Sequence, residues 1–203
     1  MITIVDYGVG NLFSLVSSFK AVGCDVQVTG ELSEIKKAEK ILLPGVGAFR
    51  DASLKLKETG IGELIKEKAA KDTPILGVCL GMQLLFDKSL EYGEWDGLGL
   101  IPGEIRPISE IVSKELKIPH MGWNALNFRE PKSPLFQYVE EGDHVYFVHS
   151  YSAVNCEEHI LATVEYSAPI TAAAGCGLVF GCQFHPEKSG NTGLSILRAF
   201  NEM

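Results

Sequence analysis

The chain has 203 residues, of which 46% are hydrophobic and 22% charged, so its composition is that of a globular domain and excludes a disordered, collagen-like or disulfide-stapled chain. The formal net charge of -8 at pH 7, with no basic cluster longer than Lys36-Lys37, argues against nucleic-acid binding, which requires clustered lysine and arginine. No apolar run approaches the ~18 residues of a membrane span and no secretory signal is visible, so we expect one domain over residues 1–203 in the cytoplasm.

The first half of the chain alternates short apolar runs with amphipathic segments. The apolar runs predict strands over residues 2–5, 26–29, 40–43 and 74–78. The amphipathic segments predict helices over residues 12–19, 49–58, 61–71 and 80–88, the first of them capped by Asn11. This alternation predicts an α/β fold, a three-layer sandwich with a mostly parallel central sheet covered on both faces.

The second half has a different pattern. Residues 92–107 are rich in glycine and proline, and short β-like runs follow them. Strands are expected over residues 116–118, 144–148, 160–165, 171–174 and 178–184, with a closing helix over 193–200. We expect some of these strands to continue the central sheet and others to form antiparallel pairs.

Five cysteines are present, with no Cys-x-x-Cys pair and no zinc-site spacing, so neither a metal site nor a disulfide framework is expected. Cys79 differs from the others because it lies between Gly77 and Gly81, where the strand at 74–78 meets a helix. This is the glycine–x–nucleophile–x–glycine elbow, in which glycine avoids a collision across the turn and the helix N-terminus favours a thiolate. The alternative is a buried structural cysteine.

A thiolate nucleophile needs a base, and the base needs a group that orients it. His185 follows the last predicted strand, and Glu187 lies two residues further, where its carboxylate can reach the imidazole ring. The candidate triad is therefore Cys79, His185 and Glu187, and the other histidines are interpreted as ordinary polar residues.

Together, the segments GVCLGMQ (77–83) and QFHPE (183–187) resemble the two main signatures of the class I, triad-type glutamine amidotransferases. The resemblance runs almost end to end and implies that family's flavodoxin-like fold. Four further segments resemble the glutaminase subunits of imidazole glycerol phosphate synthases: DYGVGNL (6–12), PGVGAF (44–49), PHMGWN (119–124) and YFVHSY (146–151).

The resemblance implies that Cys79 attacks the side-chain amide of L-glutamine and forms a thioester, with no cofactor and no metal. The backbone N–H of Leu80 and an N–H of Val46 or Gly47 are expected to form the oxyanion hole. By the same resemblance, Gly47, Gln83, Ser150 and Tyr151 are expected to contact glutamine.

Free ammonia would be protonated in water, and the chain has no second chemical motif, so a partner must hold the acceptor site. The resemblance implies a heterodimer with a (β/α)8-barrel cyclase subunit that makes imidazole glycerol phosphate and AICAR in histidine biosynthesis. Candidate contact residues are Asn11, Trp123, Tyr146 and Lys188, although Trp123 can equally be a core residue.

Several alternatives remain open. Paralogous glutaminases feed ammonia to other synthases, and the triad does not separate them. A non-catalytic glutamine-binding subunit would have a broken triad, and a free-standing γ-glutamyl hydrolase would usually be secreted. A dinucleotide site is disfavoured because the third glycine of the G-x-G-x-x-G fingerprint is replaced by Phe13 after Gly8-x-Gly10, and by Arg50 after Gly45-x-Gly47.

Overall fold

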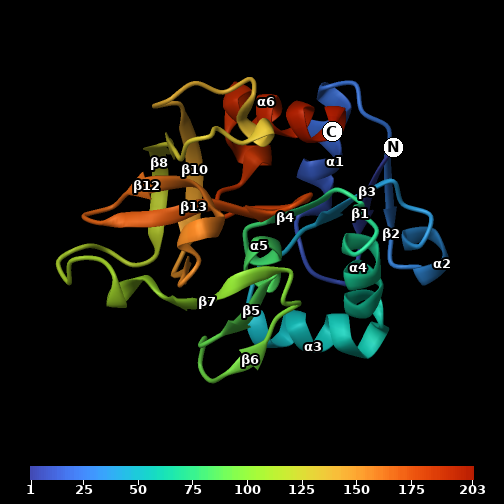
Figure 1. Ribbon diagram of the computed structural model, residues 1–203, viewed down its shortest axis with the longest axis horizontal. Coiled ribbons are helices and arrows are strands. Elements are labelled where there is room, and N and C mark those ends of the chain that lie inside the picture. Colours follow the sequence, from blue (N-terminus) through green and yellow to red (C-terminus); the bar gives the residue numbers. More distant parts are fainter.

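The computed structural model describes residues 1–203 and confirms the α/β fold (Figure 1). The helices are α1 (Leu12–Ala21), α2 (Leu32–Ile35), α3 (Phe49–Thr59), α4 (Ile61–Ala69), α5 (Leu80–Leu84) and α6 (Gly190–Glu202). The strands are β1 (Ile2–Val5), β2 (Val26–Thr29), β3 (Lys40–Leu43), β4 (Ile75–Val78), β5 (Phe86–Ser89), β6 (Trp95–Asp96), β7 (Ile101–Pro107), β8 (His120–Ala125), β9 (Asn127–Phe128), β10 (His144–His149), β11 (Tyr151–Val154), β12 (Ile160–Glu165), β13 (Pro169–Cys176) and β14 (Val179–Cys182).

The central sheet has eight strands in the order β2-β1-β3-β4-β14-β13-β12-β9. The first five of these are parallel, and the remaining three extend the sheet with antiparallel pairings. The carboxyl ends of the parallel strands therefore lie along one edge, where ligands usually bind in open α/β sheets.

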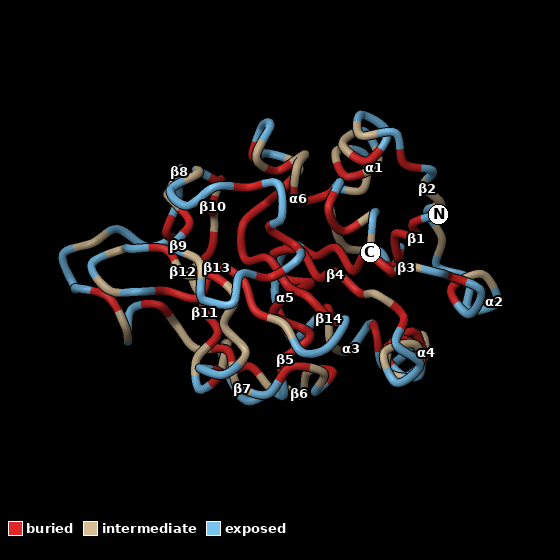
Figure 2. Tube along the Cα trace, turned by 45° about the horizontal axis from the view of Figure 1, so that its top comes forward, coloured by how far each residue is buried: buried red, intermediate tan, exposed pale blue.

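Helices cover both faces of the sheet (Figure 1), and each face has its own apolar core. One core of 28 buried residues lies between the sheet and α1, α6 and β10, and includes Phe19 and Phe200. The other, of 25 buried residues, lies between the sheet and α3 and α4, and includes Phe49 and Ile65. The trace in Figure 2 is accordingly buried along the central strands and exposed at the rim. No helix is both long and apolar enough to span a membrane.

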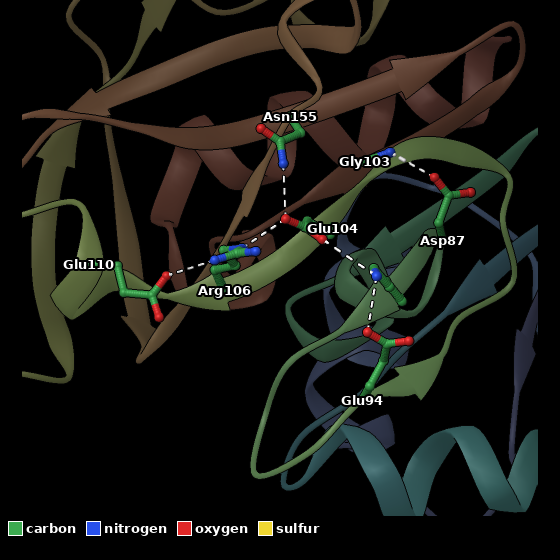
Figure 3. Close-up of polar contacts among 8 residues, drawn as sticks. Asp87, Glu94, Gly103, Glu104, Arg106, Glu110 and Asn155 are labelled. Atoms are coloured by element: carbon green, nitrogen blue, oxygen red, sulfur yellow. Dashed lines mark hydrogen bonds and ion pairs between the residues drawn. The ribbon is translucent and has the colours of Figure 1, made fainter.

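Two smaller sheets flank the central one: the antiparallel pair β10-β8 and the four-stranded sheet β11-β7-β5-β6. Polar contacts tie the second sheet together (Figure 3). Arg106 on β7 pairs with Glu104 at 2.7 Å and Glu110 at 3.3 Å, and Asn155, directly after β11, donates to Glu104 at 2.9 Å. Most of these side chains are exposed, so their contacts add little to stability. We infer that they mainly keep the strands aligned.

Three sequence expectations are wrong in detail. Residues 116–118 are irregular rather than a strand, and the last expected strand ends at Cys182. The helix expected over 80–88 stops at Leu84, because Phe86–Ser89 pairs in parallel with β7 instead. Strand β7 itself was missed because Pro102, Gly103 and Pro107 disguise it, although it is hydrogen-bonded on both sides.

Candidate active site

Cys79 lies at the sharp turn between β4 and α5, with φ 55° and ψ -110°, a strained conformation for a residue with a side chain. Both flanking positions require glycine, because a side chain there would collide with neighbouring backbone atoms. A Cβ atom on Gly77 would lie 2.6 Å from the Gly81 carbonyl oxygen, and one on Gly81 would lie 1.9 Å from the Leu43 carbonyl oxygen. The turn therefore presents the sulfur at the carboxyl edge of the sheet.

His185 and Glu187 follow β14, the strand paired with β4, so the sheet brings them beside the cysteine. His185 Nδ1 lies 2.8 Å from Glu187 Oε1, and both side chains are almost fully buried. The His185 backbone is held from both sides, because its N–H donates to the Tyr146 carbonyl at 3.0 Å and its carbonyl accepts from Ser189 Oγ at 2.7 Å. The ring is therefore positioned before any substrate arrives.

The electrostatics of His185 follow from these contacts. Burial lowers its pKa, but the neighbouring Cys79 sulfur and the Glu187 carboxylate outweigh burial and raise the pKa to about 9. Since Nδ1 faces Glu187, the other ring nitrogen is the one that faces the sulfur. Both neighbours therefore favour the imidazolium form of the ring, which can stabilise a thiolate and donate a proton.

A cavity of about 330 Å³ opens over the sulfur. Most of the predicted site residues line it: Val46, Gly47, Cys79, Leu80, Gln83, Ser150, Tyr151, His185 and Lys188. Glu187 lies behind His185 rather than in the wall. Three wall residues were not predicted: Glu91, Val148 and His149.

The loop over residues 44–47 packs directly on the elbow. Tyr7, which is buried, donates its hydroxyl to the Pro44 carbonyl at 2.7 Å. The Gly45 carbonyl accepts the Leu80 N–H at 3.3 Å, so the first expected oxyanion donor is already engaged. Gly47 has φ 95°, a conformation that suits glycine.

Tyr7 and Glu91 were missed by sequence analysis. The Glu91 carboxylate accepts the Phe49 N–H at the start of α3 with a distance of 2.6 Å. Tyr7 contacts the loop from 37 positions away in the chain and Glu91 contacts the start of α3 from 42 positions away, and no local motif marks such contacts.

Three of the four expected partner-contact residues lie together. Trp123 on β8 pairs in register with Tyr146 on β10, with ring centroids 5.9 Å apart, and Lys188 Nζ lies 5.9 Å from the Tyr146 ring centre. Trp123 is 52% exposed, which excludes the core alternative. Asn11 is the N-cap of α1.

Comparison with known proteins agrees with this geometry. The family model described as "Glutamine amidotransferase class-I" matches residues 3–202. The imidazole glycerol phosphate synthase subunit HisH of Geobacillus kaustophilus is 48% identical over 98% of this chain and 95% of its own length. The protein of the same name from Oceanobacillus iheyensis is 47% identical over 100% of this chain and 99% of its own.

Solved structures share the fold. PurLQS from Thermotoga maritima superposes with a TM-score of 0.77 at 19% identity, over 99% of this chain and 97% of that one. A structure described as a glutamine amidotransferase gives a TM-score of 0.76 at 16% identity, over 99% and 100% of the two chains. The family model matches nearly the whole length of this chain, and relatives of the same family are close to half identical to it in sequence. The chain therefore belongs to the class-I glutamine amidotransferases.

Proposed function

We propose that this protein is the glutaminase subunit of an imidazole glycerol phosphate synthase, a single domain that releases ammonia from L-glutamine for a cyclase subunit. The observation that carries the chemistry is the cysteine on a strained elbow beside a buried His185–Glu187 pair, inside a cavity. Relatives named as this subunit at 48% and 47% identity support the specific synthase.

Cys79 is the proposed nucleophile. Its thiolate attacks the side-chain amide carbon of glutamine, and a tetrahedral oxyanion forms. His185 gives its proton to the departing ammonia, which leaves a thioester on Cys79. His185 then takes a proton from water, whose oxygen attacks the thioester, and glutamate leaves as the thiolate is restored. Glu187 holds the ring at Nδ1 and stabilises its charged form throughout.

The oxyanion is proposed to bind the Leu80 N–H together with an N–H of Val46 or Gly47. Because Leu80 now donates to the Gly45 carbonyl, this carbonyl must move away before the hole is complete. Glycines on both sides of Val46 make such a rearrangement of the loop inexpensive. The loop is therefore a natural point at which partner binding can control hydrolysis.

The remaining cavity residues fit the amino-acid end of glutamine. We assign this end to Gly47, Gln83, Ser150 and Tyr151. The Glu91 carboxylate adds the negative charge that an α-ammonium group requires. No group of three or more metal-ligating side chains is assembled anywhere in the chain, and the proposed reaction needs no cofactor.

The proposed partner is a (β/α)8-barrel cyclase that forms a heterodimer with this chain. Apolar side chains are exposed near the site, among them Val46 at 44%, Met121 at 60% and Trp123 at 52%. Exposed aromatic and apolar groups of this kind commonly anchor interfaces. Covering them would also close the cavity, so that ammonia passes to the cyclase unprotonated rather than into water.

The test is glutamate release by the purified chain, with and without the cyclase subunit and its ligand. We expect stimulation of at least about tenfold by the liganded cyclase, and Cys79→Ala should lower the rate by at least about 1,000-fold, as loss of a nucleophile does. Cys176→Ser, which changes the exposed cysteine, is the control and should behave as wild type.

Two results would contradict the proposal. Hydrolysis retained by Cys79→Ala removes the assigned nucleophile. Full hydrolysis by the wild type with no response to the cyclase indicates a paralogous glutaminase that feeds another synthase.

A further inference from the structure

A buried amide lies directly behind the Cys79 sulfur. Gln183 is 0% exposed, does not line the cavity, and has its Nε2 atom 3.9 Å from Cys79 Sγ. The residue directly precedes Phe184 in the segment that carries His185, and its backbone N–H is fixed to the Ala172 carbonyl at 2.9 Å. Its side chain is therefore held against the sulfur from the side away from solvent.

The hydrogen bonds around Gln183 determine which end of its amide faces the sulfur. The Tyr151 carbonyl oxygen can only accept, so Gln83 turns its NH2 group toward it at 3.5 Å. The same NH2 group donates to Gln183 Oε1 at 3.0 Å. With its oxygen committed to Gln83, Gln183 must present its NH2 group to the sulfur.

The Tyr151 carbonyl is itself held in place by a second donor. His149 Nδ1 lies 2.7 Å from this oxygen and therefore carries the proton, which leaves Nε2 to contact His120 Nδ1 at 2.9 Å. Burial lowers the pKa of His149 to about 4, so the ring stays neutral and keeps this arrangement near pH 7. A series of hydrogen bonds thus runs from His149 through the Tyr151 carbonyl, Gln83 and Gln183 to the sulfur.

A donor at this position meets a need that the elbow leaves unmet. The helix that follows Cys79 has only five residues, Leu80–Leu84, so few peptide dipoles align behind the sulfur. The Leu80 N–H is also engaged by the Gly45 carbonyl. Gln183 supplies an N–H group from a different direction, from the buried side of the sulfur, where water has little access.

We propose that Gln183 is a catalytic hydrogen-bond donor to the Cys79 sulfur, which stabilises the thiolate, and that Gln83 acts as the positioning residue that fixes its amide. The inference rests on Cys79 being the nucleophile of the proposed function. The interaction is with the charged form of the sulfur, so its loss should raise the pH at which Cys79 becomes reactive.

The test is the pH–rate profile for alkylation of Cys79 by iodoacetamide, followed by mass spectrometry of the Cys79 peptide between pH 5 and 10. This reaction needs neither glutamine nor a partner. In Gln183→Met, which keeps the bulk and removes the donor, we expect the rate at pH 7 to fall roughly tenfold, the scale of one hydrogen bond to an ionised group. The wild-type and variant rates should converge at high pH.

Gln83→Met is the second variant, adds no charge and leaves Gln183 in place. It removes the NH2 group that holds Gln183 Oε1, so the Gln183 amide is no longer fixed with its NH2 group toward the sulfur. The pH–rate profile for alkylation of Cys79 should then move to higher pH, as in Gln183→Met. This variant keeps the test informative if Gln183→Met does not fold.

Gln27→Met is the matched control, because Gln27 lies on the edge strand β2 and bonds to Glu34 instead. Its profile should coincide with that of wild type. In glutamine hydrolysis, Gln183→Met should lower kcat by about the same roughly tenfold factor with little change in KM, because Gln183 lies outside the cavity wall.

Coincident alkylation profiles for wild type, Gln183→Met and Gln83→Met would overturn the proposal. So would a rate lowered equally at every pH, because that result indicates a packing role. Either result leaves the assignment of Cys79 intact, whereas only retained hydrolysis in Cys79→Ala removes that assignment.

Discussion

At the scale of single residues, two acceptors lie on the two nitrogens of one imidazole ring, with Glu187 at Nδ1 and the Cys79 sulfur on the other side. His185 is buried, which by itself disfavours the imidazolium, yet its contacts with Cys79 and Glu187 raise its pKa to about 9. Both contacts therefore favour the charged form of the ring in the folded protein. Glu187 Oε2 has no hydrogen-bond partner, so the other carboxylate oxygen, facing His185, carries the interaction.

This arrangement predicts a pH-dependent contribution to stability. A pKa raised from 6.5 to about 9 gives stability that is fully present below pH 6.5 and is lost as pH rises through 9. In Glu187→Gln the folded-state pKa of His185 falls, so the variant should be less stable than wild type by about 1–2 kcal/mol at pH 6. This gap should shrink by pH 10.

Urea unfolding at pH 6 and pH 10 measures the effect, and an NMR titration of the imidazole measures the pKa. Glu158→Gln changes an exposed carboxylate and serves as control. A constant difference between Glu187→Gln and wild type at both pH values would speak against the linkage.

At the scale of elements, the sharp turn at Cys79 depends on the close approach of three backbone segments. The β4–α5 turn lies against the end of β3 and the loop after it, and glycine at positions 45, 77 and 81 permits that approach. The same crowding that presents Cys79, the proposed nucleophile, therefore brings the 44–47 loop, the proposed source of an oxyanion donor, within reach of it.

Gly81→Ala tests this crowding. Its Cβ would lie 1.9 Å from the Leu43 carbonyl oxygen, a backbone atom that cannot move without shifting β3. We expect a loss of at least about 3 kcal/mol in the free energy of unfolding, measured with denaturant. Gly62→Ala in α4 is the control, because its nearest contact is the Leu98 side chain at 3.2 Å, and it should change stability by less than about 1 kcal/mol. Similar stabilities for the two variants would contradict the argument.

At the scale of the whole molecule, the parallel strands bring their carboxyl ends to one edge, and the loops there hold both the proposed catalytic residues and the proposed interface. The Trp123–Tyr146–Lys188 group extends this edge onto the β10-β8 pair. A partner seated on this group would therefore contact a residue, Lys188, that also lines the cavity. Partner binding can therefore change the rate of hydrolysis through a residue that lies at both sites.

Trp123→Ala should weaken binding of the cyclase subunit by about tenfold or more, because the side chain is exposed and aromatic anchors contribute strongly to interfaces. Titration calorimetry of the two subunits measures this. Leu178→Ala is the control, because Leu178 is also exposed but lies directly before β14, at the amino ends of the parallel strands. Equal dissociation constants for the two variants would place the interface elsewhere.

Some elements of the fold were predictable from the sequence and others were not. The parallel half was predictable because each strand is a short apolar run and each helix has an apolar face, which are local properties. Strand β7 and the short helix α5 were not, because pairing between Phe86–Ser89 and Ile101–Pro107 overrides both a helical pattern and a proline- and glycine-rich composition. Such pairing depends on tertiary contacts.

The site divides in the same way. The sequence by itself determined the elbow at Cys79 and the His185–Glu187 pair, because a tight turn and a two-residue reach are encoded by neighbouring residues. Only the tertiary structure decided that Gln183 faces the sulfur, 104 positions along the chain from it, and that Tyr7 and Glu91 hold the loop and the helix beside it. The physical reason is that an amide or carboxylate acquires its role from the partner it meets, and the fold alone chooses that partner.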